Sequence, residues 1–272
     1  SSFFKLVTCN YLWISYNIFM RFSKPRILVI GDKCSDQYSY GTVDRLCPDV
    51  PAPVFVSTKA IHTDGMAGNV ARQLEQWGCD VYTKFNDEFI CKRKYIDEKT
   101  NHTLLRVDIE PNVKCILPQE LRILLSNAED KWDAIIVSDY GKGYLNHSSI
   151  EFICQSHPMV FVDTKKKIDL FLKDVAFIKI NEPEWKATKD NINPSDWRDK
   201  IIVTLGSEGC MYNDEVFPVS IVDVLDLSGA GDTFMCGLVM KYVQTESIKE
   251  AIHFANDCSM KVVQKKGVAV LD

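Results

Sequence analysis

The sequence predicts an α/β protein built around a mainly parallel β-sheet. From Arg26 onward, short apolar runs rich in β-branched residues alternate with amphipathic stretches, which is typical of successive strand–helix units. Each run ends at a polar residue or a glycine, as expected where a strand buried on both faces leaves its sheet. The 272 residues are enough for one large domain with a full core or for two small domains.

Five apolar runs are predicted as buried strands, and they span residues 26–32, 134–139, 159–163, 176–181 and 200–206. Ligands of parallel sheets bind beyond the carboxyl ends of the strands, so the residues that end these runs are the first functional candidates.

Helices are predicted between the strands from the spacing of apolar residues. Val70, Leu74 and Trp77 recur at i, i+4 and i+7, which predicts a helix from residue 68 to 77 that ends at Gly78. After Gly229, two helical stretches are expected to run to about residue 265, with a break near 245–247.

Two segments depart from this alternation, residues 37–62 and 89–109. The first contains Pro48, Pro51 and Pro53, and the second has β-rich flanks around DEKTNHT. Both are predicted as antiparallel strands outside the main sheet, forming a small β lid over its carboxyl edge. The chain has no linker long enough to separate two domains, so residues 26–272 are predicted to form one domain with a lid.

Composition and charge exclude several classes of protein. With 46% hydrophobic and 25% charged residues, the chain is neither disordered nor collagen-like nor a coiled coil. The net charge of −5 provides no basic field for nucleic acid or an anionic membrane, so a small molecule is the expected partner. The ten cysteines form no C-x-x-C pair, which predicts small buried side chains in a reducing compartment, the cytoplasm.

Residues 1–25 precede the first predicted strand. The stretch from Phe3 to Met20 is apolar and aromatic, but Lys5, Asn10 and Asn17 interrupt it, so neither a membrane span nor a signal peptide is indicated. We treat residues 1–25 as an N-terminal extension. Met20 is a candidate natural start, which would make residues 1–19 foreign to the native protein.

The stretch DLSGAGDTF, residues 226–234, carries the clearest chemical signal. Small residues at a helix start let backbone N–H groups approach an anion, and the helix dipole adds to the attraction. Asp232 would repel phosphate unless its task is to take a proton from an attacking hydroxyl. On spacing alone, a glycine turn in which Asp232 caps the helix explains the stretch equally well.

DLSGAGDTF resembles the C-terminal signature of the ribokinase/PfkB family of carbohydrate kinases. Further segments resemble that family in the same order, in particular the branch of bacterial heptose 7-phosphate kinases: VIGDKCSDQYSYG (29–41), DGMAGNVA (64–71), LLRVDIE (104–110), VSDYGKGYL (137–145), VDTK (162–165), NEPE (181–184) and TLGSEG (204–209). The resemblance covers residues 26–272. It implies a ribokinase-like three-layer α/β/α fold, ATP as phosphate donor and Mg²⁺ as metal.

The resemblance also implies roles for individual residues. Asp232 would be the general base that activates a sugar hydroxyl, an effect worth about 10²–10⁴ in rate. The backbone N–H groups of Gly229, Ala230 and Gly231 would stabilise the transferring phosphoryl group. Asn181 and Glu184 match the family's N-x-x-E motif and would help hold Mg²⁺, partly through water. From the residues alone, NEPE is also an ordinary strand end followed by a helix start.

Substrate and nucleotide residues follow from the same resemblance. Asp36 would accept hydrogen bonds from two sugar hydroxyls, and Asn69 would also bond the sugar. Gly65 and Gly68 would give access to it. Asp32 either assists Asp36 or caps the turn. The predicted nucleotide-binding residues are Thr204, Gly206 and Gly209.

Three basic residues are candidates for reading an anionic sugar substrate. Lys142 and Lys165 come just after predicted strand ends, and Arg106 lies in the predicted lid. None of them is assigned to a substrate phosphate, because a solvated surface charge is the commoner role of a single lysine.

The chain departs from the family pattern at two places. Met66 stands where the family has a second glycine after Gly65, which predicts a narrowed sugar pocket or an altered substrate choice. After WGCDVYTKF the chain enters the lid segment almost at once, so about one helix–strand unit is missing. That loss would expose an edge of the sheet.

The sequence therefore predicts an ATP- and Mg²⁺-dependent kinase for a sugar or sugar phosphate, with a heptose 7-phosphate-like substrate first. The alternatives are a kinase for another sugar or a nucleoside, and a catalytically impaired nucleotide or sugar binder. The resemblance also suggests a homodimer formed through the lid. We expect no nucleotidyltransferase domain after Asp272, so a later activation step would need a separate protein.

Overall fold

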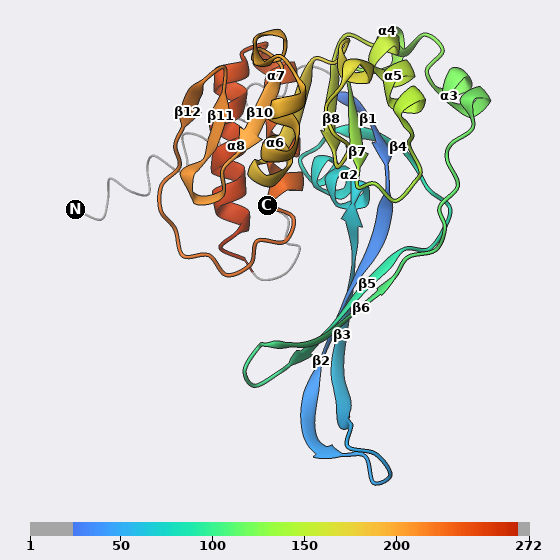
Figure 1. The fold of residues 1–272 in the computed structure, drawn as a ribbon, viewed down its shortest axis with the longest axis vertical. Helices are drawn as coiled ribbons and strands as arrows, with labels where there is room; N and C mark the ends of the chain where they lie inside the picture. The colour runs from blue at the N-terminus through green and yellow to red at the C-terminus, as the bar shows by residue number, and fades with distance from the viewer. Residues whose placement is uncertain (1–23, 266–272) are drawn as a thin grey trace.

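The computed structural model describes residues 24–265, so residues 1–23 of the predicted N-terminal extension lie outside the described residues. Its centre is an eight-stranded sheet in the order β12-β11-β10-β9-β8-β7-β1-β4, with helices on both faces (Figure 1). Strands β4, β1, β7, β8, β9 and β10 are mutually parallel, and β11 and β12 add an antiparallel hairpin at one edge. The predicted three-layer α/β/α fold with a mainly parallel sheet is confirmed.

The strands of this sheet are β1 (Arg26–Gly31), β4 (Asp80–Phe85), β7 (Ala134–Asp139), β8 (Val160–Thr164), β9 (Phe177–Asn181), β10 (Ile201–Thr204), β11 (Cys210–Tyr212) and β12 (Glu215–Phe217). All five predicted strands are present within one or two residues of their expected bounds. The sequence analysis did not predict β4, β11 or β12 as strands. β4 is half-exposed and lacks an apolar run, and β11 and β12 have three residues each, too few to show a period.

The helices are α2 (Ala67–Gln76), α3 (Pro118–Leu124), α4 (Ala128–Lys131), α5 (His147–Ser156), α6 (Glu182–Thr188), α7 (Ala230–Thr245) and α8 (Ile248–Val262). The helix predicted at 68–77 is α2, and Gly78 follows it with φ of 86°. The predicted break near residue 246 separates α7 from α8. There Glu246 takes a left-handed conformation, and the Ser247 side chain accepts a hydrogen bond from the Glu250 N–H.

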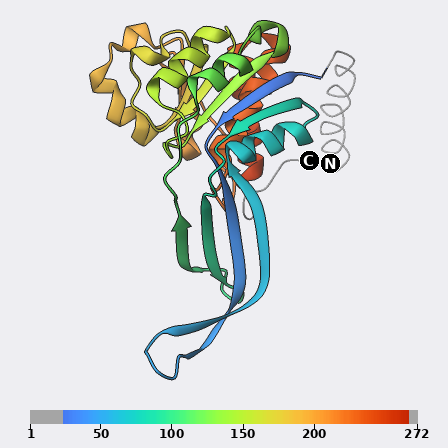
Figure 2. The same cartoon turned by 90° about the vertical axis from the view of Figure 1, so that its right-hand side faces the viewer.

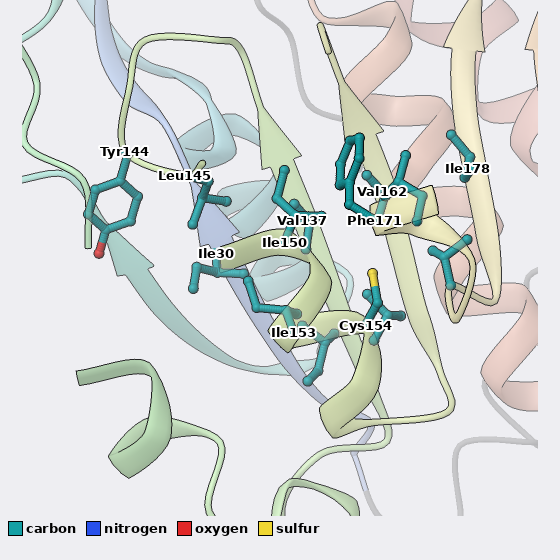
Figure 3. Packing of buried hydrophobic residues seen from close by; sticks show 14 of the residues in the cluster. Ile30, Val137, Tyr144, Leu145, Ile150, Ile153, Cys154, Val162, Phe171 and Ile178 are labelled. Atoms are coloured by element: carbon teal, nitrogen blue, oxygen red, sulfur yellow. The ribbon is translucent and has the colours of Figure 1, made fainter. Parts of the chain in front are cut away.

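Alternating side chains of the parallel strands fill two cores, one on each face of the sheet. Ile27, Val29, Phe161 and Phe177 face α2, α7 and α8. On the other face, side chains of β1, β7, β8 and β9 pack against α5 and its neighbours, as Figure 3 shows for Ile30, Val137, Val162, Ile150 and Ile153. The buried sheet is a rigid base for the residues at its carboxyl edge.

The lid is a second sheet of four strands in the order β3-β2-β5-β6. Its strands are β2 (Lys33–Leu46), β3 (Pro53–Met66), β5 (Cys91–Asp97) and β6 (Thr103–Ile109). The hairpins β2–β3 and β5–β6 are antiparallel, as predicted, and they join through a parallel pair, β2 with β5. The lid projects from the main body as a long twisted ribbon (Figure 2). Its first hairpin extends beyond the predicted 37–62 to residues 33–66, so Asp36 and Gly65 lie at its base.

Two further observations concern the whole described region. Among residues 24–265, no helix is both long and apolar enough to cross a membrane. Nine cysteines lie in this region as free thiols, seven of them buried.

Candidate functional site

Asp232 lies in the first turn of α7, at the carboxyl edge of the sheet, and is 5% exposed. Its Oδ2 accepts a hydrogen bond from Asn69 Nδ2 at 2.8 Å, and its Oδ1 accepts one from the Tyr140 hydroxyl at 2.7 Å. Gly229 is the N-cap residue of α7, and no side chain caps the helix. The alternative in which Asp232 caps the helix is therefore wrong, because its carboxylate faces Asn69 and Tyr140.

Burial controls the acid–base properties of this group. Desolvation raises the pKa of Asp232, and the hydrogen bonds from Asn69 and Tyr140 oppose that rise. Desolvation, together with the charge of Asp232, raises the pKa of Tyr140 well above its ordinary value, so the phenol stays a hydrogen-bond donor. A carboxylate with a raised pKa is a better proton acceptor than an exposed aspartate, which suits a general base.

The loop before α7 turns its backbone toward the same edge. Gly229 has φ of 80°, a left-handed conformation that glycine adopts without strain. Of the N–H groups predicted to bind the phosphoryl group, that of Ala230 is not free, because it donates to the Leu227 carbonyl at 3.3 Å. Within residues 24–265, the N–H groups of Gly231 and Asp232 have no backbone hydrogen-bond acceptor. They point along the axis of a 16-residue helix at its positive end, which makes this loop chemically suited to an anion.

Asp36 and Asn69 approach the site from the lid base and from α2. Asn69, a predicted sugar-binding residue, donates a hydrogen bond to Asp232, the predicted base, so the two predicted sites adjoin. Desolvation raises the pKa of Asp36, while the positive charges of Lys92 and Lys94 oppose the rise. Gly65 lies beside Asp36, and a Cβ at Gly65 would come within 2.2 Å of the Asp36 Oδ2. A side chain at residue 65 would therefore displace the Asp36 carboxylate. Gly68 is buried in the first turn of α2.

Met66 has a backbone conformation that normally requires glycine. Its φ of 57° and ψ of −134° lie outside the regions that side-chain-bearing residues favour, and it precedes α2 directly. Its side chain is 3% exposed and packs into the apolar core with Cys34 and Ile90. The predicted departure from a double glycine thus places backbone strain at the junction of lid and α2.

Asp32 follows β1 and organises the loop after β7. Its Oδ2 accepts hydrogen bonds from the backbone N–H groups of Tyr140 at 2.8 Å and Lys142 at 3.0 Å. Of the two roles considered for Asp32, the structure favours the cap. Through this cap, Asp32 positions the Tyr140 residue that bonds Asp232.

The three predicted nucleotide residues follow one another along β10 and its hairpin. Thr204 ends β10, and its hydroxyl bonds the Ile180 carbonyl at 3.2 Å. Gly206 has φ of 62° with open space beside it, whereas the backbone of Gly209 packs against the Phe217 carbonyl. Gly206 is thus the accessible member of the set.

Asn181 and Glu184 form a capping box at the start of α6. The Asn181 Oδ1 accepts the Glu184 N–H at 2.9 Å, and the Glu184 Oε2 accepts the Asn181 N–H at 2.8 Å. Glu184 also pairs with Lys165. Within the described residues, no cluster of three or more His, Cys, Asp or Glu side chains forms a metal cage. One carboxylate and one amide still suit Mg²⁺ held mainly by water and substrate phosphates.

The basic residues near the site differ in their partners. Lys142 pairs with Glu110, Lys165 with Glu184 and Arg106 with Asp108, so all three cations singled out in the sequence are neutralised. Lys92 and Lys94 of β5 make no salt bridge in the described part of the chain. Their ammonium groups lie 5.5 Å from the ring centroids of Tyr140 and Tyr38, respectively, and both act on Asp36.

Comparison with known proteins gives a family match. Residues 153–271 match the family model described as pfkB family carbohydrate kinase. The HldE bifunctional proteins of a Nitratiruptor species and of Campylobacter curvus are 28% and 30% identical, each over 90% of this chain. The match to the family model covers the carboxyl-terminal part of this chain, and the similarity to the HldE proteins extends over 90% of it. The chain spans 63% of the length of these two relatives.

Solved structures of the same fold cover nearly all of this chain. A carbohydrate kinase from Agrobacterium tumefaciens has a TM-score of 0.67 and 17% identity, covering 90% of this chain and 92% of its own. Phosphofructokinase-2 from Escherichia coli has a TM-score of 0.65 and 15% identity, covering 92% and 95%. Arabidopsis thaliana ribokinase, solved with ribose and ATP, has a TM-score of 0.61 and 16% identity, covering 90% and 94%.

Two observations bear on the helix–strand unit that was predicted to be missing. The alignment of this chain with the Nitratiruptor relative runs over 291 residues, more than the 272 that the chain contains, so the relative holds segments that this chain lacks. In the described structure, β4 ends the main sheet at the side where that unit was expected. Both agree with the prediction.

The sequence analysis missed four residues that surround Asp232 and Asp36. Tyr140 lies in SDYGKG, a stretch in which the sequence analysis singled out Lys142 instead. Lys92 lies in β5 of the lid, where no recognisable motif marks it. Lys179 interrupts the apolar run AFIKIN, and Asp163 ends the run before it; a charged residue inside a buried strand was the signal that could have identified this pair.

Proposed function

We propose that this chain transfers the γ-phosphoryl group of ATP to a hydroxyl of a phosphorylated sugar. The observation that carries the proposal is the buried Asp232 carboxylate, held by Asn69 and Tyr140 beside the open N–H groups that begin α7. A proton acceptor and an anion site at one helix start are the two groups that phosphoryl transfer requires.

The proposed reaction assigns each residue one task. Asp232 takes the proton of the sugar hydroxyl, whose oxygen attacks the γ-phosphorus while the bond to the β,γ-bridging oxygen breaks and ADP leaves. Gly231 and Asp232 N–H groups bond the transferring phosphoryl oxygens, and Asp36 and Asn69 orient the sugar. Mg²⁺, when held near Asn181 and Glu184, would neutralise charge on the phosphates. Tyr140 keeps Asp232 in place.

A phosphorylated sugar is favoured over a neutral one because of the charges facing Asp36. Lys92 and Lys94 project from the same lid face as Asp36, since Asp36 pairs with Lys92 in register and Tyr38 with Lys94. Both lysines lack a salt-bridged carboxylate within the described residues, so a substrate phosphate can supply the partner. The resemblance to heptose 7-phosphate kinases puts a heptose 7-phosphate-like sugar first.

The test is ADP release from Mg·ATP with heptose 7-phosphate, fructose 6-phosphate, ribose and adenosine, and with Asp232→Asn as the blank. Turnover on a phosphorylated sugar that Asp232→Asn abolishes supports the proposal. Turnover only on ribose or adenosine would reassign the substrate. ATP binding without turnover would favour an impaired binder, with the shortened sheet as the cause.

The role of Lys92 has its own test. Lys92→Met should raise the KM for the phosphorylated sugar about tenfold or more, because one charge-assisted contact is lost, while the KM for ATP stays unchanged. Lys99→Met is the matched control, since Lys99 lies at the lid tip and pairs with Asp44. Equal KM values for Lys92→Met and the control would exclude Lys92 as the phosphate reader.

We further propose that two copies associate through their lids. By strand alternation, Leu105, Val107 and Ile109 of β6 lie on the lid face opposite to Asp36 and Lys92. All three are exposed, and Leu105 is 55% exposed. An apolar stripe on a projecting edge strand is a surface that a second lid would cover.

A further inference from the structure

Behind Asp232, the side chains of Asp163 and Lys179 form a buried ion pair. They are directly opposite in the register of β8 and β9, and the Lys179 Nζ lies 2.5 Å from the Asp163 Oδ2. Each residue is 5% exposed, as is Asp232. Two buried carboxylates therefore share one buried ammonium, which is an unbalanced charge arrangement for a core.

The hydrogen bonds of this pair are incomplete. The Asp163 Oδ1 is buried and has no hydrogen-bond partner in the described structure. Asp163 Oδ2 is the sole hydrogen-bond acceptor for Lys179 within residues 24–265, although an ammonium group donates three hydrogen bonds. A purely structural pair would be expected to fill these positions, because unmet hydrogen bonds in a core are costly.

The position of Lys179 indicates what it serves. Phe161, Asp163, Phe177 and Lys179 lie on the sheet face that packs against α7. A Cβ at Gly231 would lie 3.0 Å from the Lys179 Nζ, so the missing side chain at Gly231 gives the ammonium access to the loop. Lys179 thus brings a positive charge to the N–H groups that begin α7.

From this geometry we propose that Lys179 is a phosphate-binding residue of the site, held by Asp163 until a nucleotide phosphate takes its free hydrogen bonds. The inference rests on the proposed kinase function and deepens it, because it assigns a contact to the phosphate chain of the nucleotide. In a site closed to water, an ammonium stabilises phosphate charge more strongly than at the surface. Asp163 keeps Lys179 paired when no phosphate is bound.

The experiment compares ligands that differ only in phosphates. Calorimetric titration of the full chain with adenosine, ADP and Mg·ATP separates contacts to the nucleoside from contacts to the phosphates. Lys179→Met should weaken Mg·ATP binding about tenfold or more and adenosine binding less than about twofold. Asp163→Asn should retain ATP binding, because Lys179 remains and is released from its carboxylate partner.

Controls separate this role from a structural one. If Lys179→Met does not fold, Asp163→Asn/Lys179→Met removes the uncompensated carboxylate and should show the same loss for ATP. Lys166→Met is the matched control. Lys166 pairs with Asp139 at 2.6 Å, and Asp139 shares with Val137 the sheet face away from α7, so the control should leave the ATP-to-adenosine ratio unchanged.

The outcomes distinguish this inference from the proposed function. Equal losses for adenosine and ATP in Lys179→Met or in the double variant, or no loss, would overturn the role of Lys179 whatever the sugar assays show. A phosphate-dependent loss in a chain that turns over no sugar would support Lys179 and reject the kinase activity. A wild-type chain that binds no ATP overturns both.

Discussion

Asp232 is the single residue on which the proposed chemistry depends most. Asp232→Asn should reduce kcat by about 10²–10⁴, because the amide cannot take the hydroxyl proton. Binding of Mg·ATP should be unchanged, since the open N–H groups belong to the backbone. Single-turnover assays and calorimetry on the same preparation measure both quantities. A variant that retains more than half of the wild-type kcat would remove Asp232 from the mechanism.

Burial of Asp232 also predicts a pH dependence with a definite sign. Desolvation raises the folded-state pKa above its ordinary value of 3.8, so the folded protein binds the proton more tightly than the unfolded chain. The contribution of Asp232 to stability is therefore present below pH 3.8 and is lost as pH rises through the folded pKa. Above that window Asp232→Asn should be more stable than wild type. Urea unfolding across pH measures this difference, and the kcat/KM of wild type, which reports groups of the free enzyme, should fall as pH drops through the same raised pKa.

Met66 combines backbone strain with a buried side chain, and two substitutions separate these effects. Met66→Ala and Met66→Gly both lose the packed side chain, which costs about 2–5 kcal/mol. Only glycine relieves the φ of 57° and ψ of −134°, a strain of about 1–3 kcal/mol. Met66→Gly should thus unfold at higher urea than Met66→Ala, the reverse of the order in an ordinary helix or strand. The ordinary order would show that Met66 is not strained.

At the residue scale, motifs could be predicted from the sequence and contacts between motifs could not. Asp232, Asn69 and Asp36 were found because they lie in segments whose order and spacing resemble a family. Lys92, Tyr140 and Lys179 were missed because their importance comes from tertiary neighbours. Conversely, Asn181 and Glu184 show how one pair of residues can satisfy a capping box and a proposed metal site with the same oxygens.

Among the elements, the loop after β7 depends on the end of β1 for its shape. Asp32→Ala would leave the part-buried N–H groups of Tyr140 and Lys142 without their acceptor, at up to about 1–3 kcal/mol for each donor. Asp32→Asn should be far milder, because its amide oxygen can replace Oδ2. Denaturant unfolding measures both, and kcat should fall with stability in Asp32→Ala as Tyr140 shifts from Asp232. Equal stability of the two variants would contradict this cap.

Element boundaries were predictable where a strand is buried on both faces. The apolar runs of β7, β8 and β9 end at polar residues, and the structure follows them closely. The lid was predicted as antiparallel strands, but its first hairpin was predicted too short. Residues 33–36 and 63–66 are also strand, although the apolar pattern does not extend to them. The parallel β2–β5 pair was not foreseen, since strand alternation does not reveal the partner of an outer strand.

Across the whole molecule, the fold class was predictable because the strand–helix alternation and the ordered motifs agree over residues 26–272. The shortened edge was also visible, since the chain after Phe85 leads directly into the lid. The consequence of this edge for assembly could not be predicted, because the sequence of one chain does not show which partner covers an exposed strand. The main sheet carries the proposed base, whereas the lid carries both the proposed sugar contacts, Asp36 and Lys92, and the proposed interface.

Association through the lid predicts a dimer that a single charge disrupts. Leu105→Glu places a carboxylate in the exposed apolar stripe of β6, where a second lid would bury it without a partner. Wild type should have the mass of a dimer by light scattering at micromolar concentration, and Leu105→Glu the mass of a monomer. Leu170→Glu is the control, because Leu170 is equally apolar and 71% exposed but lies on the main body, so its mass should match wild type.

Leu105→Glu also tests whether association through the lid supports the proposed sugar-binding site. Asp36 and Lys92 lie on the lid, whereas Asp232 and Lys179 lie on the main body, so loosening the lid should act on the sugar and not on the nucleotide. Leu105→Glu should raise the KM for the sugar and leave the Kd for Mg·ATP unchanged. A monomeric wild type would exclude the lid dimer. A dimer that survives Leu105→Glu would move the interface away from the β6 stripe.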